Sequence, residues 1–165
     1  MNPIFKKLNF KDQPQIHIVN APESFKKHMS EMTFSTDVKT GMGGAKKVSF
    51  FLAFVTKQIE VDDLTTKVVS LIEGDGLIWF AYPKGTSKKY TCEFNRDNGW
   101  TVLGKHGYEP VRMVAIDEDW SALRFRKAEN IKTMTRSFAM SDTGKKKVAT
   151  AKKKIAKKAV KKKKK

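Results

Sequence analysis

Apolar and polar residues are spaced differently in successive parts of the chain, and each spacing predicts a different element. Residues 15–20, QIHIVN, alternate between the two classes, which is typical of a strand with one buried face. Residues 48–55 and 77–82, VSFFLAFV and LIWFAY, are almost entirely apolar, which favours strands buried on both faces of a parallel sheet. Residues 109–116 and 120–126 complete the set, and the short acidic turn between them predicts that these two strands pair antiparallel.

Three helices are predicted between these strands, because apolar residues recur there at helical spacing. The first covers residues 23–32, and the second begins at Asp62, whose carboxylate can cap a helix. The third begins at Asn95 or Asp97 and ends at Gly107.

The alternation of strands and helices predicts an α/β fold with a Rossmann-like open sheet, mostly parallel, with one antiparallel strand at the final hairpin. Residues 35–44 are expected to form a loop. If each strand is added in the same direction, right-handed crossovers place the helices mainly on one face of the sheet. The other face then needs cover, from a second copy of the chain in a homodimer or from apolar residues near its two ends: Ile4, Phe5, Leu8, Phe10, Ile131, Met134, Phe138 and Met140.

Charge divides the chain further, because its 34 basic and 17 acidic residues are unevenly distributed. Residues 145–165, the lysine-rich segment, hold 13 lysines and no acidic residue, which leaves 21 basic against 17 acidic residues in 1–144. We therefore expect an N-terminal segment (1–14), a Rossmann-like domain (15–127), a connecting segment (128–144) and a lysine-rich segment that is disordered when free.

Polyanions are the natural partners of the lysine-rich segment, because each neutralised phosphate releases condensed counterions. We expect non-specific binding to DNA or RNA, since a flexible run of lysines positions no side chain at the base edges. The lysines assigned to this contact are Lys145, Lys146, Lys147, Lys152, Lys153, Lys154, Lys157, Lys158, Lys161, Lys162, Lys163, Lys164 and Lys165. Another polyanion, an anionic membrane surface, or a role in solubility alone are the alternatives.

Residues that follow the parallel strands form a candidate ligand edge, because ligands of open α/β sheets bind beyond the carboxyl ends of the strands. A lysine-containing loop at 83–89 and the acidic turn at 117–119 should be neighbours there. The candidate residues are Asn20, Tyr82, Lys84, Ser87, Lys88, Asp117 and Asp119. The alternative is a solvated loop and a solvated turn that attract each other weakly.

Signatures of catalysis and of cofactor binding are weak in this sequence. The glycine cluster at 41–44 precedes a strand, whereas dinucleotide and P-loop sites need their glycines between a strand and a helix. The three histidines lack metal-ligand spacing and Cys92 is the only cysteine, so no metal site is expected. We expect no catalytic residue and no cofactor, which favours a non-enzymatic protein.

Apolar runs also bear on location. The longest one, at 48–55, is too short to cross a bilayer, and the N-terminal residues lack the apolar core of a signal peptide. A single cysteine fits a reducing compartment. We expect a soluble, cytoplasmic protein without membrane insertion, associated with the nucleoid if the lysine-rich segment binds DNA.

Three short motifs carry a resemblance to a known family: YPK at 82–84, RDNGW at 96–100, and DEDWSALRFR at 117–126. In this order they are similar to the motifs of small bacterial proteins classed as a domain of unknown function. The resemblance covers about 15–127, and it implies a Rossmann-like sheet similar to the C-terminal half of a methyltransferase. It implies no activity.

The same resemblance implies structural roles for four side chains. Trp100 and Trp120 would anchor the core, and Arg96 and Arg124 would bind acidic groups within the fold. Separately, the composition of the lysine-rich segment is similar to the tails of linker histones and bacterial histone-like proteins.

Three functions are compatible with these observations. The first is a non-enzymatic α/β domain whose lysine-rich segment binds nucleic acid, DNA above all, without sequence preference. The second is a degenerate methyltransferase-like or other small-ligand-binding enzyme, which rests on topology alone. The third is a dimeric protein-interaction module that covers its bare sheet face with a second copy.

Overall fold

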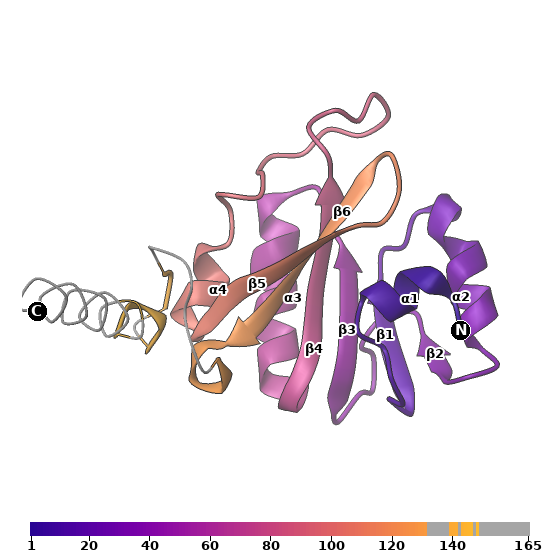
Figure 1. The fold of residues 1–165 in the computed structure, drawn as a ribbon, viewed down its shortest axis with the longest axis horizontal. Helices are drawn as coiled ribbons and strands as arrows, with labels where there is room; N and C mark the ends of the chain where they lie inside the picture. Colours follow the sequence, from indigo (N-terminus) through magenta and orange to yellow (C-terminus); the bar gives the residue numbers. More distant parts are fainter. Residues whose placement is uncertain (132–138, 142, 147, 149–165) are drawn as a thin grey trace, which may run out of the picture.

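The computed structural model describes residues 1–131, 139–141, 143–146 and 148, and it has a mixed α/β architecture built around one sheet (Figure 1). Within these residues the sheet has six strands in the order β2-β1-β3-β4-β6-β5. The strands are β1 (Gln15–Val19), β2 (Asp37–Lys39), β3 (Val48–Phe54), β4 (Ile72–Pro83), β5 (Tyr108–Ala115) and β6 (Trp120–Lys127). The helices are α1 (Pro3–Lys7), α2 (Lys26–Met32), α3 (Gln58–Leu71) and α4 (Thr101–Lys105), with 3₁₀ turns at Glu23–Phe25 and Ala128–Asn130.

Most of the sheet is parallel. Strands β2, β1, β3 and β4 pair parallel with their neighbours, whereas β6 lies antiparallel between β4 and β5. β5 consequently points in the same direction as the first four strands. β3 and the second half of β4 lie in the centre of the sheet and are buried on both faces, as their continuous apolar sequence predicted.

The loop predicted at 35–44 contains a strand, β2, which pairs with the outer edge of β1. The chain therefore steps in one direction from β1 to β2, and in the other direction to reach β3. As a result α2 covers the opposite face of the sheet from α3 and α4, and the prediction of helices mainly on one face is wrong. Strand β2 could not be predicted from the sequence, because the strand has only three residues and the two charged ones are exposed.

Alternating residues of β3 and β4 build two apolar layers, one on each face of the sheet. On one face, Phe50 and Trp79 pack with Phe5, Leu8 and Phe25 from the region of α1 and α2. We call this side the α1 face. The opposite side, the α4 face, is covered by residues from α3, α4 and the loop before α4: Val61, Val68, Phe94, Trp100 and Leu103.

The cover predicted at the N-terminus is confirmed. Phe5 and Leu8 are fully buried and Phe10 nearly so, and the Trp79 indole Nε1 donates a hydrogen bond to the Leu8 carbonyl at 3.0 Å. Residues 1–14 are therefore part of the packed domain. Because α1 and α2 cover this face, the bare surface that motivated a homodimer is already occupied.

The cover predicted at the C-terminus lies elsewhere. Met140 packs in the layer of the α4 face, and Ile131 packs with Val148 in a small separate cluster. Met134 and Phe138 lie outside the described residues.

Helix α3 begins at Gln58, four residues before the predicted cap at Asp62. The cap is Glu60, whose Oε1 accepts hydrogen bonds from the backbone N–H groups of Thr56 and Lys57, at 3.0 Å each. This is the side-chain-to-backbone half of a capping box, which satisfies donors that have no partner within the helix.

Candidate functional site

The loop after β4 and the acidic turn before β6 lie against each other, as their positions in the sequence predicted. The Lys84 backbone N–H donates to the Asp119 carbonyl at 2.8 Å, and the Ser87 hydroxyl donates to the Asp119 carboxylate at 2.8 Å. These two bonds join segments that are more than thirty residues apart in the chain.

Most polar groups of this junction already have partners within it. The Ser87 hydroxyl oxygen also accepts from the Tyr90 backbone N–H at 3.1 Å. The Asp117 carboxylate accepts from the backbone N–H groups of Asp119 and Trp120, at 2.8 Å each, which closes the turn. The arrangement accordingly acts as a clasp between loop and turn, in which the side chains of the candidates Lys84 and Lys88 take no part.

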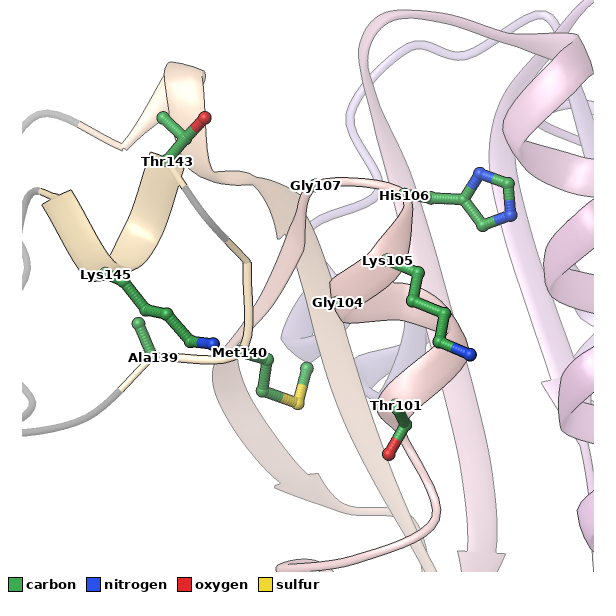
Figure 2. A pocket seen from close by; sticks show the side chains of 9 residues that line it. All are labelled: Thr101, Gly104, Lys105, His106, Gly107, Ala139, Met140, Thr143 and Lys145. Carbon is green, nitrogen blue, oxygen red and sulfur yellow. The ribbon is translucent and has the colours of Figure 1, made fainter.

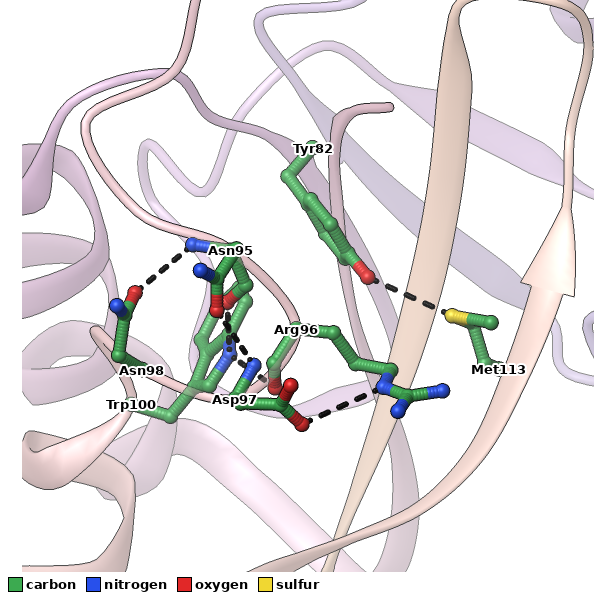
Figure 3. A network of polar contacts seen from close by, with 7 residues as sticks. All are labelled: Tyr82, Asn95, Arg96, Asp97, Asn98, Trp100 and Met113. Carbon is green, nitrogen blue, oxygen red and sulfur yellow. Dashed lines mark hydrogen bonds and ion pairs between the residues drawn. The ribbon is translucent and has the colours of Figure 1, made fainter. Parts of the chain in front are cut away.

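Two of the seven candidate residues lie away from this clasp. Tyr82 is buried on the α4 face, and its hydroxyl donates to the Met113 sulfur at 3.4 Å (Figure 3). Burial raises the pKa of the Tyr82 phenol, which keeps it protonated. The Asn20 amide donates to the Glu60 carboxylate at 3.3 Å. Neither side chain therefore takes part in the hydrogen bonds that join the loop to the turn.

The segment before α4 is a network of side-chain-to-backbone bonds (Figure 3). The Asn95 carboxamide oxygen accepts from the Asp97 N–H at 2.8 Å, and the Trp100 indole donates to the Asn95 carbonyl at 3.0 Å. Neither Asn95 nor Asp97 caps a helix, because the segment that contains them forms turns and α4 begins only at Thr101. Trp100 is buried, as the family resemblance implied.

The other residues of the resemblance have mixed outcomes. Trp120 is also buried, so its predicted role as a core anchor is confirmed. Arg96 contacts the carboxylate of its neighbour Asp97 at 3.4 Å, in an exposed pair. Arg124 was expected to bind an acidic group, yet among the described residues it has no hydrogen-bond or ion-pair partner.

The strand order reverses between β1 and β3, which is the point where α/β sheets usually bind ligands. Helix α3 begins there, and a helix N-terminus attracts anions. In this chain three donors at this end are already engaged: Glu60 accepts from two N–H groups before the helix, and the Glu93 carboxylate accepts from the Gln58 N–H at 2.8 Å. Two of the chain's own carboxylates thus occupy the place that a phosphate would take.

The root of the lysine-rich segment is attached to β5 through Glu109. This carboxylate is fully buried and accepts hydrogen bonds from the backbone N–H groups of Met140 and Ser141, at 2.7 Å each, and from the Ser141 hydroxyl at 2.9 Å. Gly144 is required beside it, since a Cβ there would lie 2.3 Å from the Glu109 Oε1. Glu109 could not be predicted from the sequence, because an acidic residue in a strand is usually exposed.

The first residues of the lysine-rich segment are helical, although charge repulsion predicted disorder from residue 145 onward. Residues 143–146 and 148 are in a helical conformation, and Val148 is buried against Ile131. The cap is Ser141, whose hydroxyl accepts from the Gly144 N–H at 2.9 Å. Lys147 and residues 149–165, with the other predicted lysine contacts, lie outside the described residues.

A hollow of about 750 Å³ lies between this root and α4 (Figure 2). Thr143 and Lys145 line it from the root, and Thr101, Lys105 and His106 line it from α4 and the residue after it. Two ammonium groups and two hydroxyls make its rim polar and basic, which extends the positive charge of the lysine-rich segment onto the folded domain.

Among residues 1–131 and the described residues beyond them, no group of three histidines, cysteines or acidic residues could hold a metal ion. Burial raises the pKa of the Cys92 thiol, which opposes formation of the reactive thiolate. His17 is a core residue, whose Nδ1 lies 2.9 Å from the Gly41 carbonyl oxygen.

In the described part of the chain, none of the helices has the length and apolar character needed to span a bilayer.

No protein-family model matches the chain, and no curated protein matches it significantly. Its function therefore has to be inferred from the sequence and the geometry of the structure.

Proposed function

We propose that this chain is a non-enzymatic nucleic-acid tether, in which the lysine-rich segment binds DNA or RNA without sequence preference and thereby localises a folded α/β domain. The observation that carries the proposal is the separation of charge: 13 lysines and no acid in residues 145–165, against a domain that is nearly balanced. Multiple phosphate contacts by lysines supply affinity without base readout.

The root geometry supports this proposal. Glu109, Ser141 and Gly144 fix the start of the segment to β5, so force on the segment is transmitted to the sheet. Lys145 and Lys146 are exposed at this root. A tether needs such a firm attachment, whereas a segment that served only solubility would not.

The methyltransferase-like alternative has less support. Its cofactor or phosphate site would lie where β1 and β3 end, and Glu60 and Glu93 occupy the donors there. A Rossmann-like relationship to the small bacterial family remains part of our proposal for the fold, as does a cytoplasmic, nucleoid-associated location. Thermal stabilisation by an adenosyl cofactor or a nucleotide at millimolar concentration would favour the enzyme instead.

A charge-neutralised variant of the full-length chain tests the tether. Replacing the ten lysines between residues 152 and 165 by glutamine removes the charge and retains the root, and the matched control replaces the same lysines by arginine. Fluorescence anisotropy with a short duplex should show a large loss of affinity for the glutamine variant and near-natural affinity for the arginine variant.

Salt provides the second readout. If about 6–8 lysines engage duplex DNA, raising salt from about 50 to about 200 mM should weaken binding by about 10³-fold or more, with a much shallower slope for the glutamine variant. Equal affinity of the glutamine variant and the natural chain would refute the tether.

A further inference from the structure

Three arginines lie together on the α1 face, on the outer strands β5 and β6. Arg112 and Arg124 are direct partners across this pair of strands, and Arg126 follows two residues after Arg124. The partner of Arg124 on β4 is Trp79, which is fully buried on the α1 face and so identifies the side on which these arginines lie. We call Arg112, Arg124 and Arg126 the arginine trio.

A β-bulge creates this arrangement. The register between β5 and β6 shifts between Pro110 and Arg112, so Arg112 and not Val111 lies opposite Arg124. Like charges that face each other across a strand pair destabilise a sheet, and bulges are common where a side chain must be re-aimed near a functional site. The extra residue in β5 brings two positive charges together. The same shift allows Tyr108 to pack on the α4 face while Val114 and Ile116 pack on the α1 face.

The chain compensates only part of this charge. Arg126 pairs with Asp75, whose two carboxylate oxygens each accept from its Nε at 2.9 Å. Arg112 donates to the neutral Asn9 side-chain oxygen at 3.2 Å. Within the described residues, Arg124 has neither a hydrogen-bond nor an ion-pair partner, and its Nε is buried.

The electrostatic environment of Arg124 is accordingly unfavourable. Burial lowers the pKa of its guanidinium most, and the charge of Arg126 lowers it further. Asp75 opposes these effects, and Arg112 adds the smallest lowering of the pKa. Arginine nevertheless keeps its proton in proteins, so the half-buried charge of Arg124 persists and an anion beside it would compensate it. A buried donor without a partner has a cost of about 1–3 kcal/mol, more for a charged group.

We propose that Arg112 and Arg124 form a binding site for a phosphate group, with Arg126 completing its positive rim. Each planar guanidinium presents paired N–H donors that match two phosphate oxygens, and two guanidiniums side by side can embrace one phosphate. The phosphate belongs to a nucleic-acid backbone or to a small phosphorylated molecule. The site goes beyond the proposed tether, because it lies on the folded domain and uses none of the lysines of residues 145–165.

The nuclear magnetic resonance signals of the arginine Nε–H groups test the site, with pyrophosphate as the probe. In the full-length chain, millimolar pyrophosphate should shift the signals of Arg124 and Arg112. The internal control is Arg96, which is exposed and paired with Asp97, and whose signal should stay in place. An Arg124 signal that does not move, or moves no more than that of Arg96, overturns the proposal.

Two variants make the test specific. Arg112→Gln changes an exposed side chain and should weaken the response of Arg124 to pyrophosphate by about tenfold or more. Arg124→Met keeps the volume and removes the unpaired charge, so its melting temperature without phosphate should equal or exceed that of the natural chain. Pyrophosphate should raise the melting temperature of the natural chain and not that of the methionine variant. Retained stabilisation in that variant also overturns the proposal.

The glutamine variant of the lysine-rich segment distinguishes the two sources of phosphate and separates this proposal from the tether. Its Arg124 signal should still respond to pyrophosphate. A response to duplex DNA as well assigns the site to a nucleic-acid backbone, and a response to pyrophosphate alone assigns it to a small phosphorylated molecule. If the natural chain and the glutamine variant bind DNA equally, the tether fails while the Arg124 response still decides the phosphate site.

Discussion

The N-terminus of α3 and the arginine trio are two regions of positive potential. The chain's own carboxylates compensate the first region, whereas they compensate the second only in part. At α3, Glu93 accepts a hydrogen bond from the Gln58 N–H in the first turn, and Glu60 accepts from the Lys57 N–H just before the helix. At the trio, Arg126 alone pairs with a carboxylate, that of Asp75, and the buried Nε of Arg124 has no partner among the described residues. A region that the chain satisfies internally contributes to stability, whereas a region that it leaves unsatisfied is available for a ligand. Substitutions that remove buried acceptors, or a buried hydroxyl, should show how much each group contributes to the free energy of unfolding.

The largest effect is expected at Glu109, a fully buried carboxylate that accepts three hydrogen bonds from Met140 and Ser141. Glu109→Ala leaves three buried donors of Met140 and Ser141 without their acceptor, so the free energy of unfolding should fall by about 3 kcal/mol. Urea unfolding followed by circular dichroism measures the change. Glu109→Gln retains an acceptor oxygen and should lose less, and an alanine variant within about 0.5 kcal/mol of the natural chain would show that these bonds contribute little.

A smaller effect is expected at Glu60, which caps α3. Glu60→Ala should lower the free energy of unfolding by about 1–2 kcal/mol, because the N–H groups of Thr56 and Lys57 lose their acceptor. Glu60→Gln is the matched control, since its side-chain oxygen can still accept. If the alanine and glutamine variants have equal stability, the hydrogen bonds of this cap do not contribute to the stability of the fold.

The smallest effect concerns Tyr108, whose buried hydroxyl has no hydrogen-bond partner among the described residues. Burial raises its pKa to about 12, with smaller contributions from Glu129 and Asp75. Its folded pKa thus exceeds the ordinary value near 10, so the contribution to stability is complete below about pH 10 and is lost as pH rises toward about 12.

This change can be isolated by comparing the natural chain with Tyr108→Phe. Between about pH 9 and about pH 11 the natural chain should lose about 1 kcal/mol more than the phenylalanine variant, measured by urea unfolding at each pH. Lysine deprotonation affects both proteins equally and cancels in the difference. Parallel pH profiles for the two proteins would contradict the raised pKa.

Much of the architecture was predictable from local patterns. The continuous apolar runs identified β3 and β4, the alternation identified β1, and the apolar residues of the first ten positions identified the cover of the α1 face. These signals are strong because burial on one or two faces leaves a period in the sequence. The proximity of the loop after β4 to the turn at 117–119 followed from strand order and is confirmed.

The remaining features depend on contacts between distant residues. Strand β2 has three residues and no apolar period, and missing it placed α2 on the wrong face. Glu93 accepts a hydrogen bond from the first residue of a helix that begins 35 residues earlier, so no local motif could have predicted this contact. The bulge in β5 determines that Arg112, and not Val111, lies opposite Arg124. The polar and apolar pattern of one strand does not specify how that strand is aligned with its neighbour, so this pairing could not be predicted.

The placement of the two basic regions on different sides of the sheet has a mechanical consequence. Lys145 lines the hollow beside α4, whereas Arg112 contacts Asn9 on the α1 face, so β5 forms the edge between them. A polymer that touched both would have to curve around that edge within a few nanometres. Duplex DNA has a persistence length of about 50 nm and resists such curvature, while a single strand follows it easily. Simultaneous engagement of both regions by one molecule would therefore select flexible strands over stiff ones, through bending alone.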